Sequence, residues 1–190
     1  IRDGGRNEAS GEMHGLIRVR QFTISEGHLM CRPDQLEDEF KGCLELAIFM
    51  LKTLGLYEDV SYRFSMWDPE NREKYIGTEE QWDEAQGAMR RILNHLEIPY
   101  VEGVGEAAFY GPKLDIQIKN VYGKEDTLIT IQIDQLLAEK FGMEYVDSDG
   151  QRKNPYIIHR TSIGCYERTL ALLIEKYAGA LPVSYTHLRA

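Results

Sequence analysis

The sequence lacks the long apolar run that a membrane-spanning helix needs, since no stretch approaches about eighteen consecutive apolar residues. It also lacks an initiating methionine and an apolar signal core, so no secretion signal is visible. Cysteine is scarce: the three that are present lie far apart and are odd in number. This argues against a disulfide framework and favours a reducing compartment. We therefore expect a cytoplasmic protein without membrane contact.

Positive charge is also in short supply, with 22 basic against 31 acidic side chains and a net charge of -9. A free-standing nucleic-acid binder is usually basic, because the neutralisation of phosphates supplies most of its affinity. If RNA is a partner, this chain is expected to meet it locally while other domains supply the affinity. The length of 190 residues suits one domain, and the hydrophobic fraction of 43% is that of a globular protein.

The spacing of apolar residues predicts an α+β fold, with an antiparallel β-sheet flanked by helices. Polar and apolar residues alternate over 16–22, which predicts a strand that pairs with the start of the chain across a loop at 7–13. Further strands are predicted at 60–66, 114–118, 128–134 and 156–159, and helices at 33–54, 78–95 and 164–177. The strands come in adjacent hairpins with the helices between them, which indicates an antiparallel sheet.

Four side chains near the start of the chain would together suit a nucleotide. Arg6 can hold a phosphate through two hydrogen bonds, and Glu8 can accept one from an exocyclic amine. Arg18 and Phe22 would face them from the next strand, where the aromatic ring can stack on a base. Ion pairs across a solvated sheet face would produce the same pattern, so these residues by themselves leave both interpretations open.

Two histidines are candidate metal ligands, because neutral imidazole binds zinc well. His28 and His159 lie far apart in the sequence, however, and show neither C-x-x-C nor H-x-x-x-H spacing. The pattern alone therefore favours an ordinary structural role for both.

Two more segments carry functional candidates. The loop at 105–113 has glycines around small and aromatic residues, and its Gly-Pro step would project Tyr110 from a tight turn. Arg168 follows Gly164 near the start of the last predicted helix, where free N–H groups favour an anion. An ordinary loop and a solvated arginine fit the same residues, so neither segment is decisive alone.

Taken together, these segments form an ordered set of motifs. Residues 6–20 read R-N-E-A-S-G-E-M-H-G-L-I-R-V-R. Residues 106–113 read E-A-A-F-Y-G-P-K, and residues 158–168 run from I-H-R to G-C-Y-E-R. These runs resemble motifs of the class II aminoacyl-tRNA synthetases, in the form typical of threonyl-tRNA synthetases. The resemblance covers residues 2–183 and implies a partial class II synthetase catalytic domain.

The resemblance implies a role for each matched residue in binding ATP. Arg6 would bind the α-phosphate, Glu8 the adenine amine and Arg18 the terminal phosphate. Phe22 and Arg168 would enclose the adenine ring. Arg6 and Arg168 would be the catalytic residues, since they would lie on the reacting nucleotide.

The same resemblance implies a threonine site next to the ATP site. Glu26, Tyr110 and Gln132 would lie near the amino acid or the ribose of ATP. His28 and His159 would be two of the three protein ligands of a zinc ion, which would hold the amino and hydroxyl groups of threonine. A site that requires a hydroxyl rejects valine, whereas serine would have to be removed by separate editing.

The implied function is ATP-dependent activation of L-threonine to threonyl-adenylate, with Mg²⁺ bound to the ATP, and transfer of threonine to tRNA(Thr). Such chemistry depends on positioning and charge stabilisation more than on a protein nucleophile. We expect the chain to act as part of a larger, homodimeric enzyme, since neither the dimer motif nor the anticodon-binding domain of the family matches any part of it.

Some residues depart from the family pattern. The third zinc ligand of the family is a cysteine upstream of the second motif, and none of Cys31, Cys43 and Cys165 occupies that position. We therefore expect an incomplete zinc site and a fragment that is inactive alone. Residues 184–190 match nothing in the family, so a catalytic core at 1–183 and a non-native tail are predicted.

Three alternatives stay open at this point. Another class II synthetase, such as the proline or serine enzyme, would share Arg6 and Glu8 but is not expected to have His28 and His159 together. A synthetase-like protein that binds ATP or an amino acid without catalysis would keep the same fold. An α+β domain with no nucleotide site would not be expected to carry three motifs in order.

Overall fold

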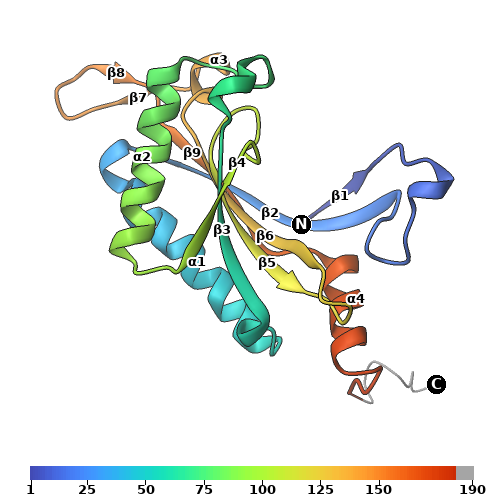
Figure 1. Ribbon diagram of the computed structural model, residues 1–190. Coiled ribbons are helices and arrows are strands. Elements are labelled where there is room, and N and C mark those ends of the chain that lie inside the picture. The colour runs from blue at the N-terminus through green and yellow to red at the C-terminus, as the bar shows by residue number, and fades with distance from the viewer. Residues whose placement is uncertain (183–190) are drawn as a thin grey trace.

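The computed structural model describes residues 1–182. A seven-stranded sheet runs through the centre of the fold (Figure 1). Its strand order is β1-β2-β9-β6-β5-β3-β4. The strands are β1 (Arg2–Gly5), β2 (Gln21–Cys31), β3 (Val60–Met66), β4 (Tyr100–Val104), β5 (Lys113–Lys119), β6 (Glu125–Asp134) and β9 (Tyr156–Cys165). Residues 183–190 lie outside the described part of the chain, so the division into a core at 1–183 and a tail at 184–190 stays a prediction.

Helices pack along this sheet, and a small second sheet lies apart from it. The helices are α1 (Leu36–Thr53), α2 (Glu79–His95), α3 (Leu137–Lys140) and α4 (Tyr166–Lys176), and the second sheet pairs β7 (Tyr145–Val146) with β8 (Arg152–Lys153). All neighbours in the large sheet are antiparallel except β3 and β4, which are parallel. The predicted α+β class is confirmed, with that one parallel pair as an exception. Within the described residues, none of the helices has the length and apolarity to cross a bilayer.

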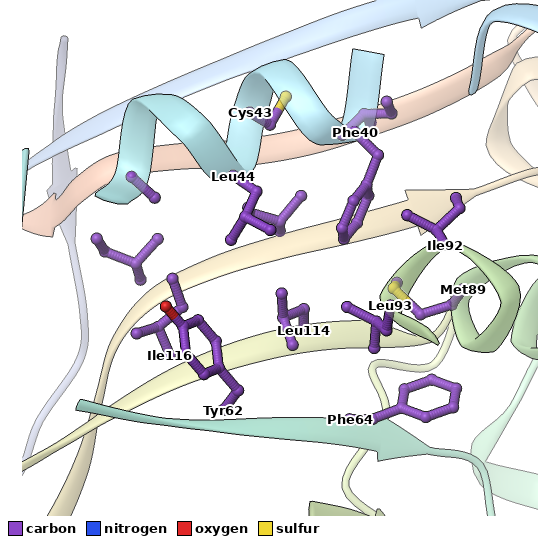
Figure 2. Packing of buried hydrophobic residues seen from close by; sticks show 14 of the residues in the cluster. Phe40, Cys43, Leu44, Tyr62, Phe64, Met89, Ile92, Leu93, Leu114 and Ile116 are labelled. Atoms are coloured by element: carbon purple, nitrogen blue, oxygen red, sulfur yellow. The ribbon is translucent and has the colours of Figure 1, made fainter. Parts of the chain in front are cut away.

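The hydrophobic core lies between the sheet and the helices α1, α2 and α4. Phe40, Leu44, Ala47 and Leu51 recur at helical spacing along α1, and all four are buried. They share this core with the apolar face of β5 at 114–118, as Figure 2 shows. Full burial of one such leucine contributes about 1.5–3 kcal/mol. The helices therefore cover one face of the sheet.

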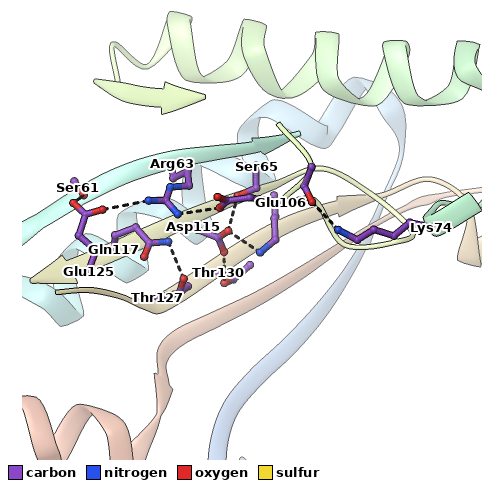
Figure 3. Close-up of polar contacts among 12 residues, drawn as sticks. Ser61, Arg63, Ser65, Lys74, Glu106, Asp115, Gln117, Glu125, Thr127 and Thr130 are labelled. Carbon is purple, nitrogen blue, oxygen red and sulfur yellow. Dashed lines mark hydrogen bonds and ion pairs between the residues drawn. The ribbon is translucent and has the colours of Figure 1, made fainter. Parts of the chain in front are cut away.

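The opposite face of the sheet is polar and carries the candidate site. Asp115 on β5 is 1% exposed, and it lies 2.7 Å from the Ser65 hydroxyl, the Thr130 hydroxyl and the Lys113 ammonium group (Figure 3). A buried carboxylate needs such partners, because its removal from water is costly. Since side chains alternate along a strand, Leu114 faces the core while Asp115 faces this polar network.

Several elements begin where the sequence predicts them. The strand at 60–66 is confirmed as β3. Thr78 caps α2 as predicted: its side chain accepts from the Gln81 N–H, and the Gln81 side chain accepts from the Thr78 N–H. These signals act over a few residues and do not depend on the rest of the fold.

Two predicted boundaries are wrong. Residues 16–20 form no continuous strand, since Arg18 makes an isolated bridge to His14, and β2 begins at Gln21. The ladder with β1 ends at Gly5, and beyond it one backbone hydrogen bond, from the Arg6 N–H to the Arg20 carbonyl at 2.9 Å, continues the pairing. In contrast, β9 continues to Cys165, through the start of the predicted last helix, because it pairs with β2 over almost its whole length and with β6 as well.

Candidate active site

A cleft of about 290 Å³ opens on the polar face of the sheet, beside the loop at 6–20. Eight of the ten residues predicted for the site line it: Arg6, Arg18, Phe22, Glu26, Tyr110, Gln132, His159 and Arg168. The other two adjoin it, because Glu8 pairs with Arg18 and His28 packs on His159. The fold thus brings together residues from distant parts of the sequence.

At one end of the cleft, two arginines surround a buried carboxylate. Glu8 is 6% exposed, and its carboxylate lies 3.0 Å from Nε and 2.9 Å from Nη2 of Arg18. The hydrogen bond from Arg18 lowers the pKa of Glu8 below its ordinary value, although burial acts in the opposite direction. The guanidinium of Arg6 lies over Phe22, with Cζ 5.4 Å from the ring centroid. Two exposed guanidinium groups beside an aromatic ring can bind the phosphates and the base of a nucleotide.

Arg168, in the first turn of α4, forms another wall of the cleft. Its Nη1 donates to the carbonyl of Thr127 at 2.8 Å and its Nη2 to the carbonyl of Ile17 at 3.5 Å. Its Nε is buried and has no hydrogen-bond partner among the described residues. The chain reaches α4 through Gly164, where φ is +68° and a Cβ atom would lie 2.0 Å from the carbonyl oxygen of Leu128. Arg168 is therefore tied to two other segments of the cleft.

His28 and His159 stand directly opposite each other on β2 and β9. Their ring centroids are 4.6 Å apart in an edge-to-face arrangement. One ring nitrogen of each, together with a carboxylate oxygen of Glu26, lie within 4.8 Å of one another. Two imidazoles and a carboxylate at this separation form a donor set that fits zinc. The antiparallel register thus creates the close spacing that the sequence lacks.

Gln132 and Tyr110 line the space next to the histidines. Gln132 is 4% exposed, and its Nε2 donates at 3.0 Å to a backbone carbonyl in the loop that carries Tyr110. The Tyr110 ring centroid is 5.2 Å from that of His159. Burial, aided by the charges of Asp134 and Glu26, raises the pKa of Tyr110 above its ordinary value. The phenol therefore stays a hydrogen-bond donor near neutral pH.

Comparison with known proteins agrees with this geometry. The family described as "tRNA synthetase class II core domain (G, H, P, S and T)" matches residues 5–177. The chain belongs to the class II tRNA synthetase core family. A "Threonine--tRNA ligase" of Clostridium perfringens (strain SM101 / Type A) is 68% identical to this synthetase core over 177 residues, which are 93% of the chain and 28% of the relative.

Two further proteins extend the comparison. A "Threonine--tRNA ligase" of Listeria monocytogenes serotype 4a (strain HCC23) is 45% identical over 177 residues, again 93% of the chain and 28% of the relative. The solved structure of the RNA binding domain of threonyl-tRNA synthetase from Cryptosporidium parvum Iowa II superposes with a TM-score of 0.85 at 34% identity, over 95% of this chain and 44% of that one. The synthetase core thus spans just over a quarter of the length of these curated relatives.

Two polar residues of the synthetase core escape the sequence-based prediction of the site. Asp134 is fully buried, and its Oδ2 lies 3.0 Å from Nε2 of His159. The alternation along β6 places Asp134 on the same face as Gln132, and this signal could have found it. Both carboxylate oxygens of Glu167 lie 3.0 Å from the Thr23 backbone nitrogen, whose N–H they accept. No local signal predicts that contact, because the two residues come from opposite ends of the chain.

The three cysteines lie outside the histidine cluster. Cys31 and Cys43 belong to the hydrophobic core, and burial raises the pKa of Cys31 to about 11. Cys165 lies at the start of α4, where its Sγ is 3.1 Å from a carboxylate oxygen of Glu167. Among the described residues, only Glu26 joins the two histidines as a possible third metal ligand.

Proposed function

We propose that this chain is the catalytic core of a cytoplasmic enzyme that activates threonine with ATP and transfers it to tRNA(Thr). Two kinds of observation support the proposal. The curated relatives are named threonine--tRNA ligases, and a cleft lined by three of the predicted arginines adjoins two histidines and a carboxylate that could hold zinc. The observation that carries it is the pairing of His28 with His159 at one end of the cleft that Arg6 and Arg168 also line. The complete enzyme would be a homodimer.

In the first step, a carboxylate oxygen of threonine attacks the α-phosphorus of ATP. The bond from that phosphorus to the bridging oxygen of pyrophosphate breaks, and threonyl-adenylate forms. Arg6 would neutralise charge on the α-phosphate, and Arg18 would hold the terminal phosphate together with Mg²⁺. Arg18 would have to exchange Glu8 for the phosphate, since the two side chains are paired.

In the second step, a ribose hydroxyl of the terminal adenosine of tRNA(Thr) attacks the threonyl carbonyl, and AMP leaves. Phe22 and Arg168 would hold the adenine ring throughout, and Glu8 would accept a hydrogen bond from its amine. Arg168 is suited to this role because two backbone carbonyls already fix its guanidinium group. The guanidinium of Arg168 would therefore be in place before the substrates arrive, whereas Arg18 would first have to leave Glu8.

Recognition of threonine would take place at the histidine end of the cleft. Bound zinc would supply a Lewis acid that holds the amino and hydroxyl groups of the substrate. His28 and His159 would hold the metal, with the cysteine that the family resemblance predicts as the third ligand. Glu26, Tyr110 and Gln132 would contact the amino acid or the ribose. A buried site that requires a hydroxyl can reject valine by a factor on the order of 10⁴.

Threonine-dependent exchange of pyrophosphate into ATP, in the full-length protein that carries this chain, tests the proposal. Zinc content is measured alongside, and valine is offered as a competitor. His28→Ala and His159→Ala should lose both zinc and exchange. His95→Ala is the matched control, because His95 is exposed at the end of α2 and outside the cleft. It should keep both.

Each other result points to a defined alternative. ATP binding without exchange for any amino acid would indicate a synthetase-like protein that does not catalyse. Exchange with proline or serine and not threonine would leave the fold standing and overturn the substrate. Full exchange and zinc content in both cleft variants would overturn the zinc-based selection of threonine.

A further inference from the structure

Asp134, at the end of β6, contacts one of the two proposed metal-binding histidines. Its Oδ2 lies 3.0 Å from Nε2 of His159. Its other oxygen, Oδ1, accepts the backbone N–H groups of Leu136 and Leu137, each at 2.9 Å. Asp134 is 0% exposed, so water does not compete for either oxygen. The carboxylate therefore has one orientation, with Oδ2 aimed at the imidazole.

This contact selects which ring nitrogen of His159 carries a proton. A carboxylate is only an acceptor, so Nε2 of His159 has to donate to Asp134. In a neutral imidazole the other nitrogen, Nδ1, then keeps its lone pair. A carboxylate oxygen of Glu26 lies within 4.8 Å of a ring nitrogen of His159. Two aromatic rings also pack on the imidazole: His28 edge to face with centroids 4.6 Å apart, and Tyr110 tilted with centroids 5.2 Å apart. Neither ring contact is a hydrogen bond that would favour the opposite tautomer.

We propose that Asp134 is a positioning residue for the metal site, which holds His159 with Nε2 protonated and with Nδ1 as the metal-binding atom. The proposal rests on the proposed zinc site and adds to it an orienting group and a specific ligand atom. Metal-bound histidines commonly donate their second N–H to a carboxylate, which fixes the ring and strengthens the ligand. Asp134 would orient a metal ligand, whereas Glu26 could itself be a ligand, because its oxygen lies within 4.8 Å of the ring nitrogens of His28 and His159.

A purely structural role for Asp134 is the competing explanation. Its two bonds to Leu136 and Leu137 hold the turn that leads into α3, and a buried aspartate with only that role would not affect metal affinity. Asp134→Asn separates the two roles. The asparagine carbonyl can still accept from both backbone N–H groups, but its amide then presents donors to His159. The imidazole has to accept through Nε2, so the proton moves to Nδ1 and competes with the metal.

The experiment compares zinc affinity in the full-length protein, by competition with a chromophoric chelator. We expect Asp134→Asn to weaken zinc binding about 10- to 100-fold. The matched control is Asp115→Asn, because Asp115 is an equally buried carboxylate on the same sheet face, bonded to Ser65, Thr130 and Lys113 but to no histidine. Its zinc affinity should stay within about twofold of the wild type, since it orients no proposed ligand.

A zinc affinity in Asp134→Asn within about twofold of the wild type would overturn the inference while the zinc site still stands. Wild-type protein that exchanges pyrophosphate with threonine but binds no zinc would also overturn it, without touching the proposed activity. If Asp134→Asn does not fold, a crystal structure of the zinc-loaded wild type decides the question. Nδ1 of His159 on the metal and Nε2 on Asp134 would support the inference, and Nε2 on the metal would overturn it.

Discussion

The carboxylate of Glu8 is paired with the guanidinium of Arg18, 3.0 Å from Nε and 2.9 Å from Nη2. Both residues are proposed to contact ATP, at opposite ends of the nucleotide. Their pairing links the charge of the loop at 6–20 to nucleotide binding, because a phosphate that takes Arg18 leaves Glu8 with the more distant Arg6, at 4.0 Å. The ion pair in this loop is therefore expected to weaken both at low pH and when ATP binds.

The first prediction concerns this pair. Hydrogen bonding from Arg18 lowers the pKa of Glu8 below its ordinary value of 4.5. A lowered native pKa means that the carboxylate contributes stability above pH 4.5, and that this contribution is lost as pH falls through the lowered pKa. The difference in Tm between the wild type and Glu8→Gln should therefore shrink as pH falls below 4.5. Thermal melts at a series of pH values measure it.

Glu70→Gln is the control for this series, because Glu70 is exposed and lies in the short turn before α2, away from the cleft. Its difference from the wild type should not follow the same profile. A Glu8→Gln difference that grows towards low pH would contradict the ion-pair interpretation.

The second prediction concerns the approach to α4. Gly164→Ala places a Cβ atom 2.0 Å from the Leu128 carbonyl oxygen at a φ of +68°. We expect a loss of about 2–5 kcal/mol in the free energy of unfolding, from backbone strain together with overpacking. Gly123 has a similar φ of +77°, but a Cβ atom added there would have no atom within 4 Å. Gly123→Ala should therefore lose only the free energy of backbone strain, about 1–2 kcal/mol. Equal losses in urea denaturation would show that the contact with Leu128 relaxes freely.

The third prediction concerns the adenine end of the cleft. In Arg168→Lys, a single ammonium group replaces a planar guanidinium that reaches the carbonyls of both Thr127 and Ile17. ATP binding should weaken by about tenfold or more, which is about 1.4 kcal/mol, while threonine affinity changes little. Isothermal titration of each ligand measures the two effects separately. Arg152→Lys is the control, since Arg152 is exposed and pairs only with Glu144 among the described residues.

An ATP affinity in Arg168→Lys equal to that of the wild type would remove Arg168 from the proposed adenine site. A parallel loss of ATP and threonine affinity would instead indicate that the arginine mainly holds the shape of the cleft.

The fourth prediction concerns an aromatic cluster that hydrogen bonds link to the loop carrying Tyr110. Trp82 stacks on Trp67 with ring centroids 5.5 Å apart, and its Nε1 donates to the carbonyl of Ile76 at 2.8 Å. The Ile76 N–H in turn donates to the carbonyl of Phe109, next to Tyr110. Trp82→Ala should cost about 3–5 kcal/mol of folding free energy and also weaken threonine binding.

Phe49→Ala is the matched control, because Phe49 is 63% exposed on α1 and its loss should cost less than about 0.5 kcal/mol. Urea denaturation and threonine titration measure both effects. Unchanged threonine affinity in a folded Trp82→Ala protein would show that the cluster stabilises the fold without positioning Tyr110.

Sequence reasoning succeeded where the signal is local. The capping box at Thr78 and Gln81 predicts the start of α2, because both hydrogen bonds form within one turn of helix. It failed over 16–20, where alternation resembles a strand but the partner strand β1 ends at Gly5. Alternation predicts which residues share a face of a strand. It does not predict whether a neighbouring strand is present to pair with them.

The same limit applies to the candidate site. From residue types and spacing alone, His28 and His159 look like ordinary histidines, and only the resemblance to a family assigned them a metal. The alternation along β6 predicts that Asp134 and Gln132 share a face of the sheet. It does not predict the contact between Asp134 and His159, which depends on the register of β6 against β9. A side chain's neighbours on its own strand follow from the sequence, whereas its neighbours across the sheet do not.

The sequence by itself determined the α+β class, the amphipathic helices and the motifs that place the chain in its family, because hydrophobic periodicity and capping act over a few residues. Only the tertiary structure decided that His28 and His159 face each other with Glu26 beside them, and that Arg168 is anchored to the loop at 6–20. The register of β2 against β9 depends on burying one face of each strand under α1 and α4. No short stretch of sequence contains that information.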